Sequence, residues 1–194
     1  MNYLAHFYLA DPEPELMFGN FIGDGVRGSQ FSRFPSEVSR GIQFHRFIDS
    51  YTDQHPEVME AKKLFYPTQS KFSGVVVDVL FDHLLALGWD EHHQQDLPTF
   101  ASHCYRVVEQ RRELLPIRSE RFFHFMKGND ILPQYASKNG IRRVFQGMDG
   151  RTKFTSNMTT SIDEAQVFWR ELEGHFKRFF PDLVDVCVKW KTTH

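Results

Sequence analysis

Histidines and acidic residues occupy a helix face that should otherwise be apolar in the segment 35–54. His45 and Asp49 are four residues apart, and Asp53 follows after four more, a spacing that aligns side chains along one helix face. Their neighbours on this face are Val38, Ile42, Ile48 and Thr52. A buried histidine with carboxylates is unfavourable unless the groups pair or bind a cation. We therefore predict His45 and Asp49 as metal ligands, with a structural ion pair as the alternative, and Asp53 as a ligand or a partner of one.

A second segment, 74–89, is apolar on nearly all sides and still carries two carboxylates. Asp78 and Asp82 are four residues apart, and His83 directly follows Asp82. Two carboxylates in a dry environment repel each other, and a divalent cation removes this conflict. We predict Asp82 and His83 as metal ligands and Asp78 as a close neighbour. An interhelical hydrogen bond is the alternative for Asp82 and His83, and pairing with Arg or Lys is the alternative for Asp78.

Two further candidates lie near the N-terminus. Asp24 stands between Gly23 and Gly25, whose missing side chains allow close approach of a metal or substrate. We expect Asp24 to bind metal, although an ordinary turn aspartate has the same appearance. His6 lies in an apolar segment. It is predicted as a catalytic residue, a ligand or a hydrogen-bond partner of a ligand.

A mixed set of histidine and carboxylate ligands suits Mn²⁺, Fe²⁺, Zn²⁺ or Mg²⁺. Such an ion lowers the pKa of a bound water and neutralises charge on a phosphoryl oxygen, while a nearby Asp or His accepts the proton. This combination predicts metal-assisted hydrolysis of a phosphate ester. The sequence has no Walker-type glycine-rich loop, Gly-x-Ser-x-Gly elbow or HExxH motif. It therefore disfavours nucleoside-triphosphate motors, serine hydrolases and zinc proteases.

The elements that must position these residues are predicted to be helices. Three- and four-residue apolar spacing predicts an all-α, compact helical bundle that forms one domain over 1–194. Val75–Val77 alone would also suit a strand. A capping box at Ser161–Glu164 should open the last helix, and Pro181 should kink or break it. A loop is expected at 152–160. The expected helices are 15–26, 35–54, 56–65, 74–89, 96–115, 120–127, 138–148 and the two parts of 161–191.

Composition restricts the class of protein further. The chain has 194 residues and a formal net charge of −2, so no overall basic field favours nucleic acid. Its two cysteines do not form a disulfide framework. No basic leader is present, and no apolar stretch approaches the roughly 20 residues needed to span a bilayer. We expect a cytoplasmic protein without a membrane span.

Several motifs together carry a family resemblance. In chain order, they are Asn2-Tyr3-Leu4-Ala5-His6, Gly19-Asn20-Phe21-Ile22-Gly23-Asp24-Gly25-Val26-Arg27-Gly28, Gly41-Ile42-Gln43-Phe44-His45-Arg46-Phe47-Ile48-Asp49, Thr52-Asp53 and Asp78-Val79-Leu80-Phe81-Asp82-His83-Leu84-Leu85. This set resembles the bacterial acyl carrier protein phosphodiesterase family, a divergent branch of the HD-domain phosphohydrolases. The resemblance is dense over about the first 90 residues. The order differs from the usual HD pattern, because the doublet here is Asp-His.

The resemblance implies hydrolysis of the phosphodiester that joins 4′-phosphopantetheine to a serine of holo acyl carrier protein. It implies Mn²⁺ as the cofactor, with Mg²⁺, Fe²⁺ or Co²⁺ as alternatives. His45, Asp82 and His83 would hold the metal, and Asp24 and Asp49 would complete the set or activate water. His6, Asp53 and Asp78 would lie close by.

The implied partner is a small acidic protein, so docking needs local positive charge. Arg27 and Arg46 flank the predicted site in sequence and are candidates for contact with the substrate, and a solvated surface charge is the alternative for each. The oligomeric state has no signature in the sequence. Two rival functions remain: an HD-like phosphohydrolase acting on a nucleotide or another small phosphate ester, and a non-catalytic helical binding module.

Overall fold

The structure is a computed structural model that describes residues 1–152 and 156–194, and every regular element in these ranges is helical. The all-α prediction is therefore confirmed. The longer helices are α1 Tyr3–Ala10, α2 Pro14–Ile22, α3 Ser36–Gln54, α4 Pro56–Gln69, α5 Ser73–Leu87, α7 Leu97–Glu109, α8 Ile117–Gly128, α10 Lys138–Asp149 and α12 Trp169–Thr193. Short turns of helix are α6 Trp89–His92, α9 Ile131–Gln134 and α11 Ser161–Glu164, with 3₁₀ turns at Gly23–Gly25, Gly28–Arg33, Ser70–Phe72, Arg112–Leu114 and Met158–Thr160.

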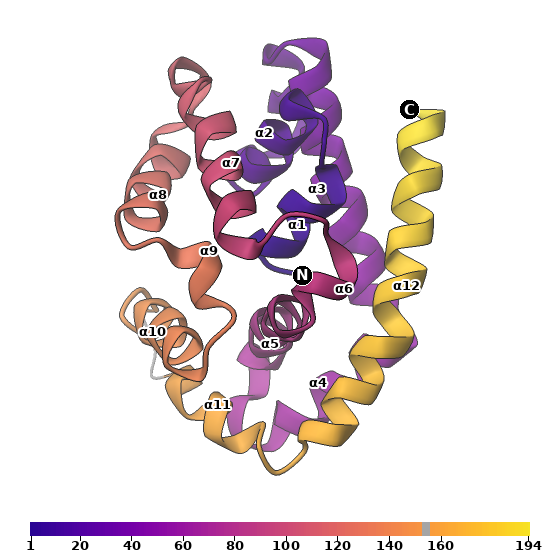
Figure 1. The fold of residues 1–194 in the computed structure, drawn as a ribbon, viewed down its shortest axis with the longest axis vertical. Helices are drawn as coiled ribbons and strands as arrows, with labels where there is room; N and C mark the ends of the chain where they lie inside the picture. Colours follow the sequence, from indigo (N-terminus) through magenta and orange to yellow (C-terminus); the bar gives the residue numbers. More distant parts are fainter. Residues whose placement is uncertain (153–155) are drawn as a thin grey trace.

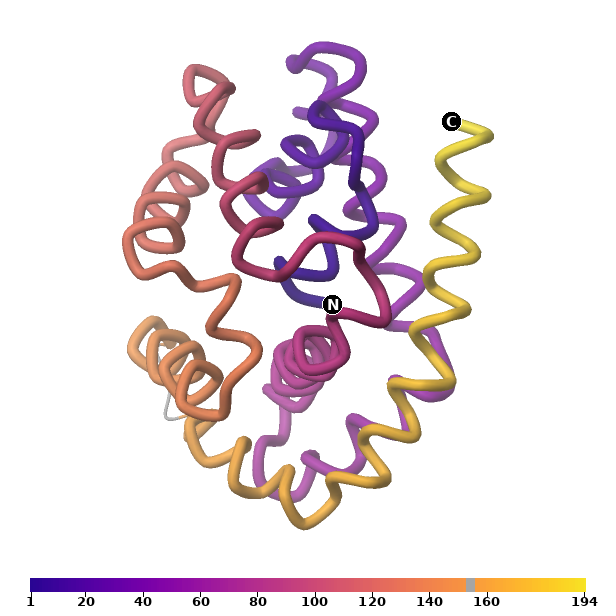
Figure 2. Tube along the Cα trace, in the orientation of Figure 1, coloured from indigo at the N-terminus to yellow at the C-terminus, as the bar shows by residue number. Residues whose placement is uncertain are grey.

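The helix α5 lies in the middle of the fold and is surrounded by the others (Figure 1). It packs against α1, α4, α10 and α12, and Val76 to Ala86 are buried except Asp78. Val75–Val77, which alone could have formed a strand, are helical. A helix that is apolar on nearly all sides is buried because each face needs an apolar partner. The chain trace shows the N-terminus close to this central helix, whereas the C-terminus lies at the periphery (Figure 2).

The helices α2 and α3 approach each other closely at two glycines. A Cβ atom on Gly19 would lie 2.2 Å from the carbonyl oxygen of Val38, and one on Gly41 would lie 2.6 Å from that of Leu16. Only glycine permits this backbone contact. The approach holds Asn20 of α2 beside His45 of α3, and both belong to the site described below.

The C-terminal helix differs from the prediction. α12 continues through Pro181 without a break, because Phe179, Phe180 and Leu183 beside it are buried and this packing offsets the lost backbone hydrogen bond. The predicted capping box forms the separate turn α11, and the Ser161 hydroxyl has no partner among the described residues. Residues 153–155 of the loop expected at 152–160 lie outside the described residues; 158–160 form a 3₁₀ turn.

The N-terminal helix α1 was not predicted from the sequence, although it carries His6. Eight residues give too short an apolar pattern for helical spacing to be recognised. No described helix combines the length and the apolar character that crossing a bilayer requires.

Candidate active site

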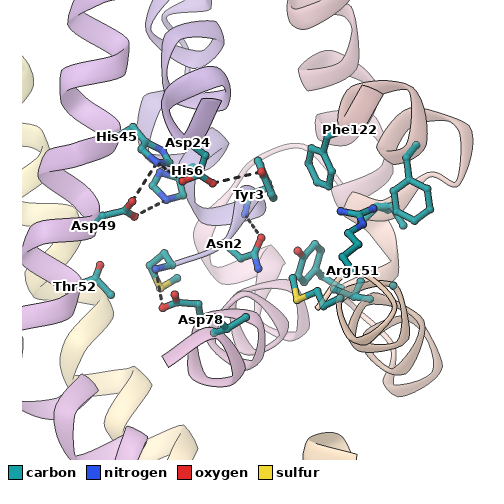
Figure 3. A pocket seen from close by; sticks show the side chains of 18 of the residues that line it. Asn2, Tyr3, His6, Asp24, His45, Asp49, Thr52, Asp78, Phe122 and Arg151 are labelled. Carbon is teal, nitrogen blue, oxygen red and sulfur yellow. Dashed lines mark hydrogen bonds and ion pairs between the residues drawn. The ribbon is translucent and has the colours of Figure 1, made fainter. Parts of the chain in front are cut away.

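A cavity of about 420 Å³ opens where the N-terminal helices face α8, α9 and α10 (Figure 3). One side of the cavity is polar. It is formed by residues of α1, the Gly23–Gly25 turn, α3 and α5, namely His6, Asp24, His45, Asp49, Thr52, Asp53 and Asp78. The cavity thus brings together most of the site residues that the sequence predicted.

Two histidine rings and one carboxylate form the centre of the polar side. The rings of His6 and His45 stack with centroids 4.3 Å apart. The two carboxylate oxygens of Asp49 each face one ring: Oδ1 lies 3.1 Å from Nε2 of His6, and Oδ2 lies 3.1 Å from Nε2 of His45. Asp24 approaches from the other side, with Oδ1 3.2 Å from the same His45 nitrogen (Figure 3).

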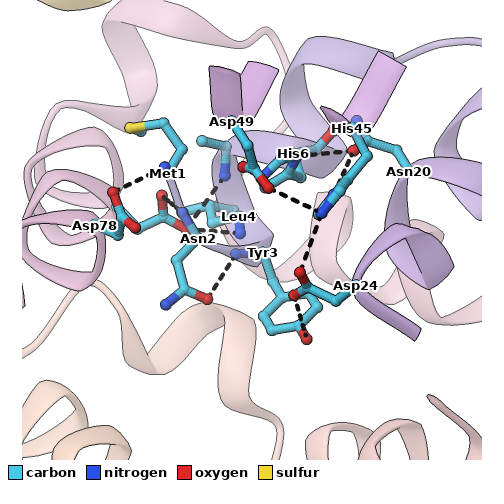
Figure 4. A network of polar contacts seen from close by, with 12 residues as sticks. Met1, Asn2, Tyr3, Leu4, His6, Asn20, Asp24, His45, Asp49 and Asp78 are labelled. Carbon is cyan, nitrogen blue, oxygen red and sulfur yellow. Dashed lines mark hydrogen bonds and ion pairs between the residues drawn. The ribbon is translucent and has the colours of Figure 1, made fainter. Parts of the chain in front are cut away.

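The buried amide of Asn20 orients both rings (Figure 4). Its nitrogen donates to the backbone carbonyl of His6 at 2.8 Å, which fixes the orientation of the amide. Its oxygen lies 2.7 Å from Nδ1 of His6 and 3.2 Å from Nδ1 of His45. An amide oxygen only accepts, so each Nδ1 carries a hydrogen, and the neutral form of each ring presents the lone pair of Nε2 to the cavity.

These lone pairs face carboxylate oxygens, which are also acceptors, so a cation or proton must lie between them. Burial lowers the pKa of His6, which keeps that ring neutral. Burial also disfavours charge on His45, but hydrogen bonds to Asp24 and Asp49 outweigh it and raise its pKa to about 9. The ligand atoms of His6, His45 and Asp49 all lie within 4.8 Å of one another. Neighbouring ligands of a cation with bonds of about 2.1 Å lie about 3 Å apart, so the residues present fit a divalent metal.

The local sequence explains how these side chains converge. His45 and Asp49 are one turn apart on α3, as their spacing predicted. A Cβ atom on Gly23 would lie 2.3 Å from the ring of His45, so this glycine makes room for the imidazole. Gly23 also begins the 3₁₀ turn Gly23–Gly25, which directs Asp24 toward the ring. Hydrogen bonding to His45 lowers the pKa of the Asp24 carboxyl, so this group is ionised at neutral pH.

Asp82 and His83 do not join this centre. Asp82 is fully buried and accepts the backbone N–H groups of Asn2, Leu4 and Ala5 at 3.0, 2.8 and 3.3 Å. These are the groups that the start of α1 leaves without helical partners. Burial raises the pKa of Asp82 to about 7, despite these bonds and the nearby terminal ammonium. Nδ1 of His83 lies 2.5 Å from the carbonyl oxygen of Tyr135, and neither Asp82 nor His83 lines the cavity.

The remaining predicted residues have individual partners. Asp78 lines the cavity and lies 2.9 Å from the N-terminal ammonium (Figure 4). Asp53 is exposed at the cavity edge and pairs with Lys62 at 2.8 Å. Arg46 donates to the carbonyl of Val26 at 2.9 Å. Arg27 is exposed, three residues after Asp24.

Sequence reasoning missed other residues at the cavity. The Tyr3 hydroxyl lies 3.5 Å from Asp24, and Arg151 lies on the side opposite the histidines. Thr52 is 1% exposed, and its hydroxyl has no partner in the described part of the chain. Spacing already placed Thr52 on the same helix face as Asp49, but it was read as part of the apolar face and given no role in the predicted site. No helical spacing in the sequence relates Tyr3 or Arg151 to the predicted site residues. Outside the cavity, His175 is buried and pairs with Glu57 at 2.6 Å.

Comparison with known proteins shows the family to which the chain belongs. The family model described as acyl carrier protein phosphodiesterase matches residues 1–183. The acyl carrier protein phosphodiesterase of Photorhabdus laumondii subsp. laumondii is 29% identical over 186 residues, which cover 95% of this chain and 94% of the relative. Those of Enterobacter sp. strain 638 and Klebsiella pneumoniae strain 342 are 31% and 32% identical over 188 residues, 95% of this chain and 96% of each relative.

No solved structure matches the chain significantly. The matched residues include the stacked histidines, their carboxylates and the whole lining of the cavity. The chain therefore belongs to the acyl carrier protein phosphodiesterase family.

Proposed function

We propose that this protein is a metal-dependent phosphodiesterase that removes 4′-phosphopantetheine from holo acyl carrier protein and leaves the apo protein. Family membership supports the substrate, because the relatives are named for it. The observation that carries the reaction class is the convergence of two histidine Nε2 atoms on one carboxylate inside a cavity. Lone pairs facing a carboxylate fit a cation, and a cation beside an open cavity suits hydrolysis of a phosphate ester.

The proposed metal ligands are His6, His45 and Asp49, with Asp24 as a further ligand or base. Mn²⁺ is the proposed ion, and Mg²⁺, Fe²⁺ and Co²⁺ suit the same ligands. When bound, such an ion polarises a phosphoryl oxygen and acidifies water. The proposal omits Asp82 and His83, because both carboxylate oxygens of Asp82 accept from the backbone at the start of α1 and Nδ1 of His83 is turned to the Tyr135 carbonyl.

The side chains at the centre have separable roles in the reaction. Asp24 is ionised and its side chain is 65% exposed, so it can accept the proton of the attacking water. The Tyr3 hydroxyl, 3.5 Å away, is placed to donate to the other oxygen of Asp24 and to orient it. A new bond forms between phosphorus and the water oxygen. The bond from phosphorus to the serine oxygen breaks, and the serine oxygen takes up a proton.

The proposed function also bears on the type of domain and on the cellular location. A ligand set of histidine and aspartate on adjacent helices suits a divergent HD-type phosphohydrolase that forms one domain. The buried side chains form one apolar cluster that extends from Met1 to Cys187. A protein that acts on acyl carrier protein is expected in the cytoplasm.

The decisive experiment is to incubate the purified protein with holo acyl carrier protein and Mn²⁺, and to weigh the carrier protein by mass spectrometry. We expect the loss of one phosphopantetheine group with Mn²⁺ and no loss with a chelator. His45→Gln should abolish the reaction, whereas His124→Gln, on the exposed face of α8, should not. Bound metal without mass loss would redirect the search to nucleotides and other small phosphate esters. If the protein binds no metal and the carrier protein loses no mass, the result would favour a non-catalytic module.

A further inference from the structure

The side of the cavity opposite the metal centre is apolar. Its lining, here called the apolar wall, comes mainly from α8, α9 and α10 and consists of Val75, Phe122, Phe125, Ile131, Val144 and Met148. Phe125 and Val75 remain 41% and 39% exposed, although they are large apolar side chains at the cavity. Exposed apolar groups that line a concave surface beside polar residues are typical of a ligand site. The proposed hydrolysis of a phosphate ester does not itself need this wall.

A single guanidinium accompanies the wall. Arg151 is the one Arg or Lys side chain that lines the cavity among the residues described. Its guanidinium lies over the ring of Phe122 at 5.5 Å and over that of Phe125 at 4.9 Å, and no carboxylate pairs with it in the described ranges. Figure 3 shows it across the cavity from the histidines and Asp49. An unpaired guanidinium held by aromatic rings is prepared for a phosphate or carboxylate ligand.

We propose that the apolar wall and Arg151 form the recognition site for the phosphopantetheine arm itself, an inference that rests on the proposed function. The arm joins a phosphodiester to a branched aliphatic chain with amides and a terminal thiol. Arg151 binds a phosphoryl oxygen that faces away from the histidines, and the aliphatic part of the arm lies along the wall. The site thereby selects phosphodiesters that carry this arm.

The arrangement of the rings argues against a nucleobase as the occupant. Within the apolar wall only Phe122 and Phe125 offer ring faces on which a base could stack, and the guanidinium of Arg151 lies over one face of each. The rest of the wall is aliphatic, formed by Val75, Ile131, Val144 and Met148. A flexible, branched aliphatic chain matches this surface better than a flat polar base.

The test measures binding to the Mn²⁺-loaded full chain by calorimetry with three probes: phosphopantetheine, pantetheine and AMP. We expect phosphopantetheine to bind more tightly than AMP. Phe125→Ala and Met148→Ala should weaken both pantetheine compounds about three- to tenfold. Arg151→Gln should weaken phosphopantetheine about tenfold or more and pantetheine little, because only the former carries the anion.

Matched controls lie outside the cavity on α8, the helix that carries Phe125. Ile117→Ala removes an apolar side chain that is 71% exposed, and Arg121→Gln removes an exposed cation; neither should change any affinity. Circular dichroism checks that each variant is folded. Unchanged affinity in the Phe125 and Met148 variants, or AMP binding as tightly as phosphopantetheine, would overturn the inference. Failure of the proposed function has a different signature, namely no mass loss from holo carrier protein.

Discussion

The metal proposal depends on a conflict between neighbouring acceptor atoms. Asn20 fixes a hydrogen on Nδ1 of both histidines, so in their neutral forms the Nε2 lone pairs point at Asp49. Spacing on one helix predicted His45 and Asp49, and that part of the site was accessible from the sequence. His6 and Asn20 reach the same point from α1 and α2, and no spacing within one helix could have related them. Spacing within one helix thus placed His45 and Asp49 on a shared face, but it could not relate residues on different helices, and the role of these residues as ligands stays a prediction.

Metal binding should compete with protonation of His45. In the metal-free protein its pKa is about 9, so the ring is mostly protonated at pH 6–8 and must lose a proton to bind metal. We expect the dissociation constant for Mn²⁺ to increase about tenfold for each pH unit lost between pH 8 and 6. Calorimetry in buffers of different ionisation enthalpy should show about one proton released per ion at pH 7. A pH-independent affinity would contradict this assignment of His45 as a ligand.

The hydroxyl of Thr52 offers a second test at this scale. It is buried at the cavity without a partner in the described ranges, an arrangement that costs stability unless a ligand satisfies it. Thr52→Val should leave the free energy of unfolding unchanged or raise it by about 1 kcal/mol, and it should lower kcat/KM about tenfold. Urea unfolding and the carrier-protein assay measure the two effects.

The matched control for Thr52 is Ser161, another buried hydroxyl without a described partner, which does not line the cavity. Ser161→Ala should have a similar effect on unfolding and none on kcat/KM. An equal loss of activity in both variants would mean that Thr52 acts only through the fold.

At the scale of elements, the acids of α5 hold the N-terminal segment in place. Asp82 accepts three N–H groups from the start of α1, and Asp78 pairs with the terminal ammonium. α1 in turn carries His6 to the centre. Sequence reasoning correctly placed Asp82 at a buried position on α5, whereas Asp78 is only half-buried. It assigned Asp82 to a metal because it did not recognise α1 as a helix whose first turn needs acceptors.

Substitution of Asp82 distinguishes these two roles. Asp82→Leu leaves three buried N–H groups without acceptors, so we expect a loss of about 3 kcal/mol or more in the free energy of unfolding. Asp82→Asn keeps an acceptor and removes a carboxyl whose pKa is raised to about 7, so it should be milder and should still bind Mn²⁺.

The sign of the pH effect at Asp82 follows from its raised pKa. Folding favours the protonated carboxyl, so its contribution to stability is present below pH 4 and is lost as pH rises to 7. As the pH rises from 4 to 7, the free energy of unfolding of Asp82→Asn should therefore increase relative to that of the parent, as measured by urea unfolding. Loss of Mn²⁺ binding by Asp82→Asn, with unfolding unchanged, would restore Asp82 as a ligand.

At the scale of the molecule, the cavity joins two parts of the chain with different chemistry. Residues before about 90 supply the histidines and acids, and residues 122–151 supply the apolar wall and Arg151. Motifs in the first part predicted the family and the reaction. The second part contains ordinary apolar helices, and its role appears only when the fold places it opposite the metal centre.

Docking of an acidic carrier protein should depend on positive charge at the rim of the cavity. Arg27 is exposed near Asp24, whereas Arg46 also holds the carbonyl of Val26 and lies over Phe31 at 5.2 Å. Reversal of Arg46 would therefore disturb the structure, and Arg27→Glu is the cleaner variant. We expect it to raise KM for holo carrier protein about tenfold at low salt and to leave kcat unchanged, because rim charges act mainly on association.

The same variant should hydrolyse methyl 4-nitrophenyl phosphate at the parental rate, because that substrate has no acidic surface. Lys189→Glu, an exposed charge reversal near the end of α12, controls for net charge. Salt should remove the difference between Arg27→Glu and the parent, since exposed charges are screened beyond about 8 Å at physiological ionic strength. Equal losses on both substrates would show that Arg27 supports the catalytic centre, and the docking surface would then have to lie elsewhere on the rim.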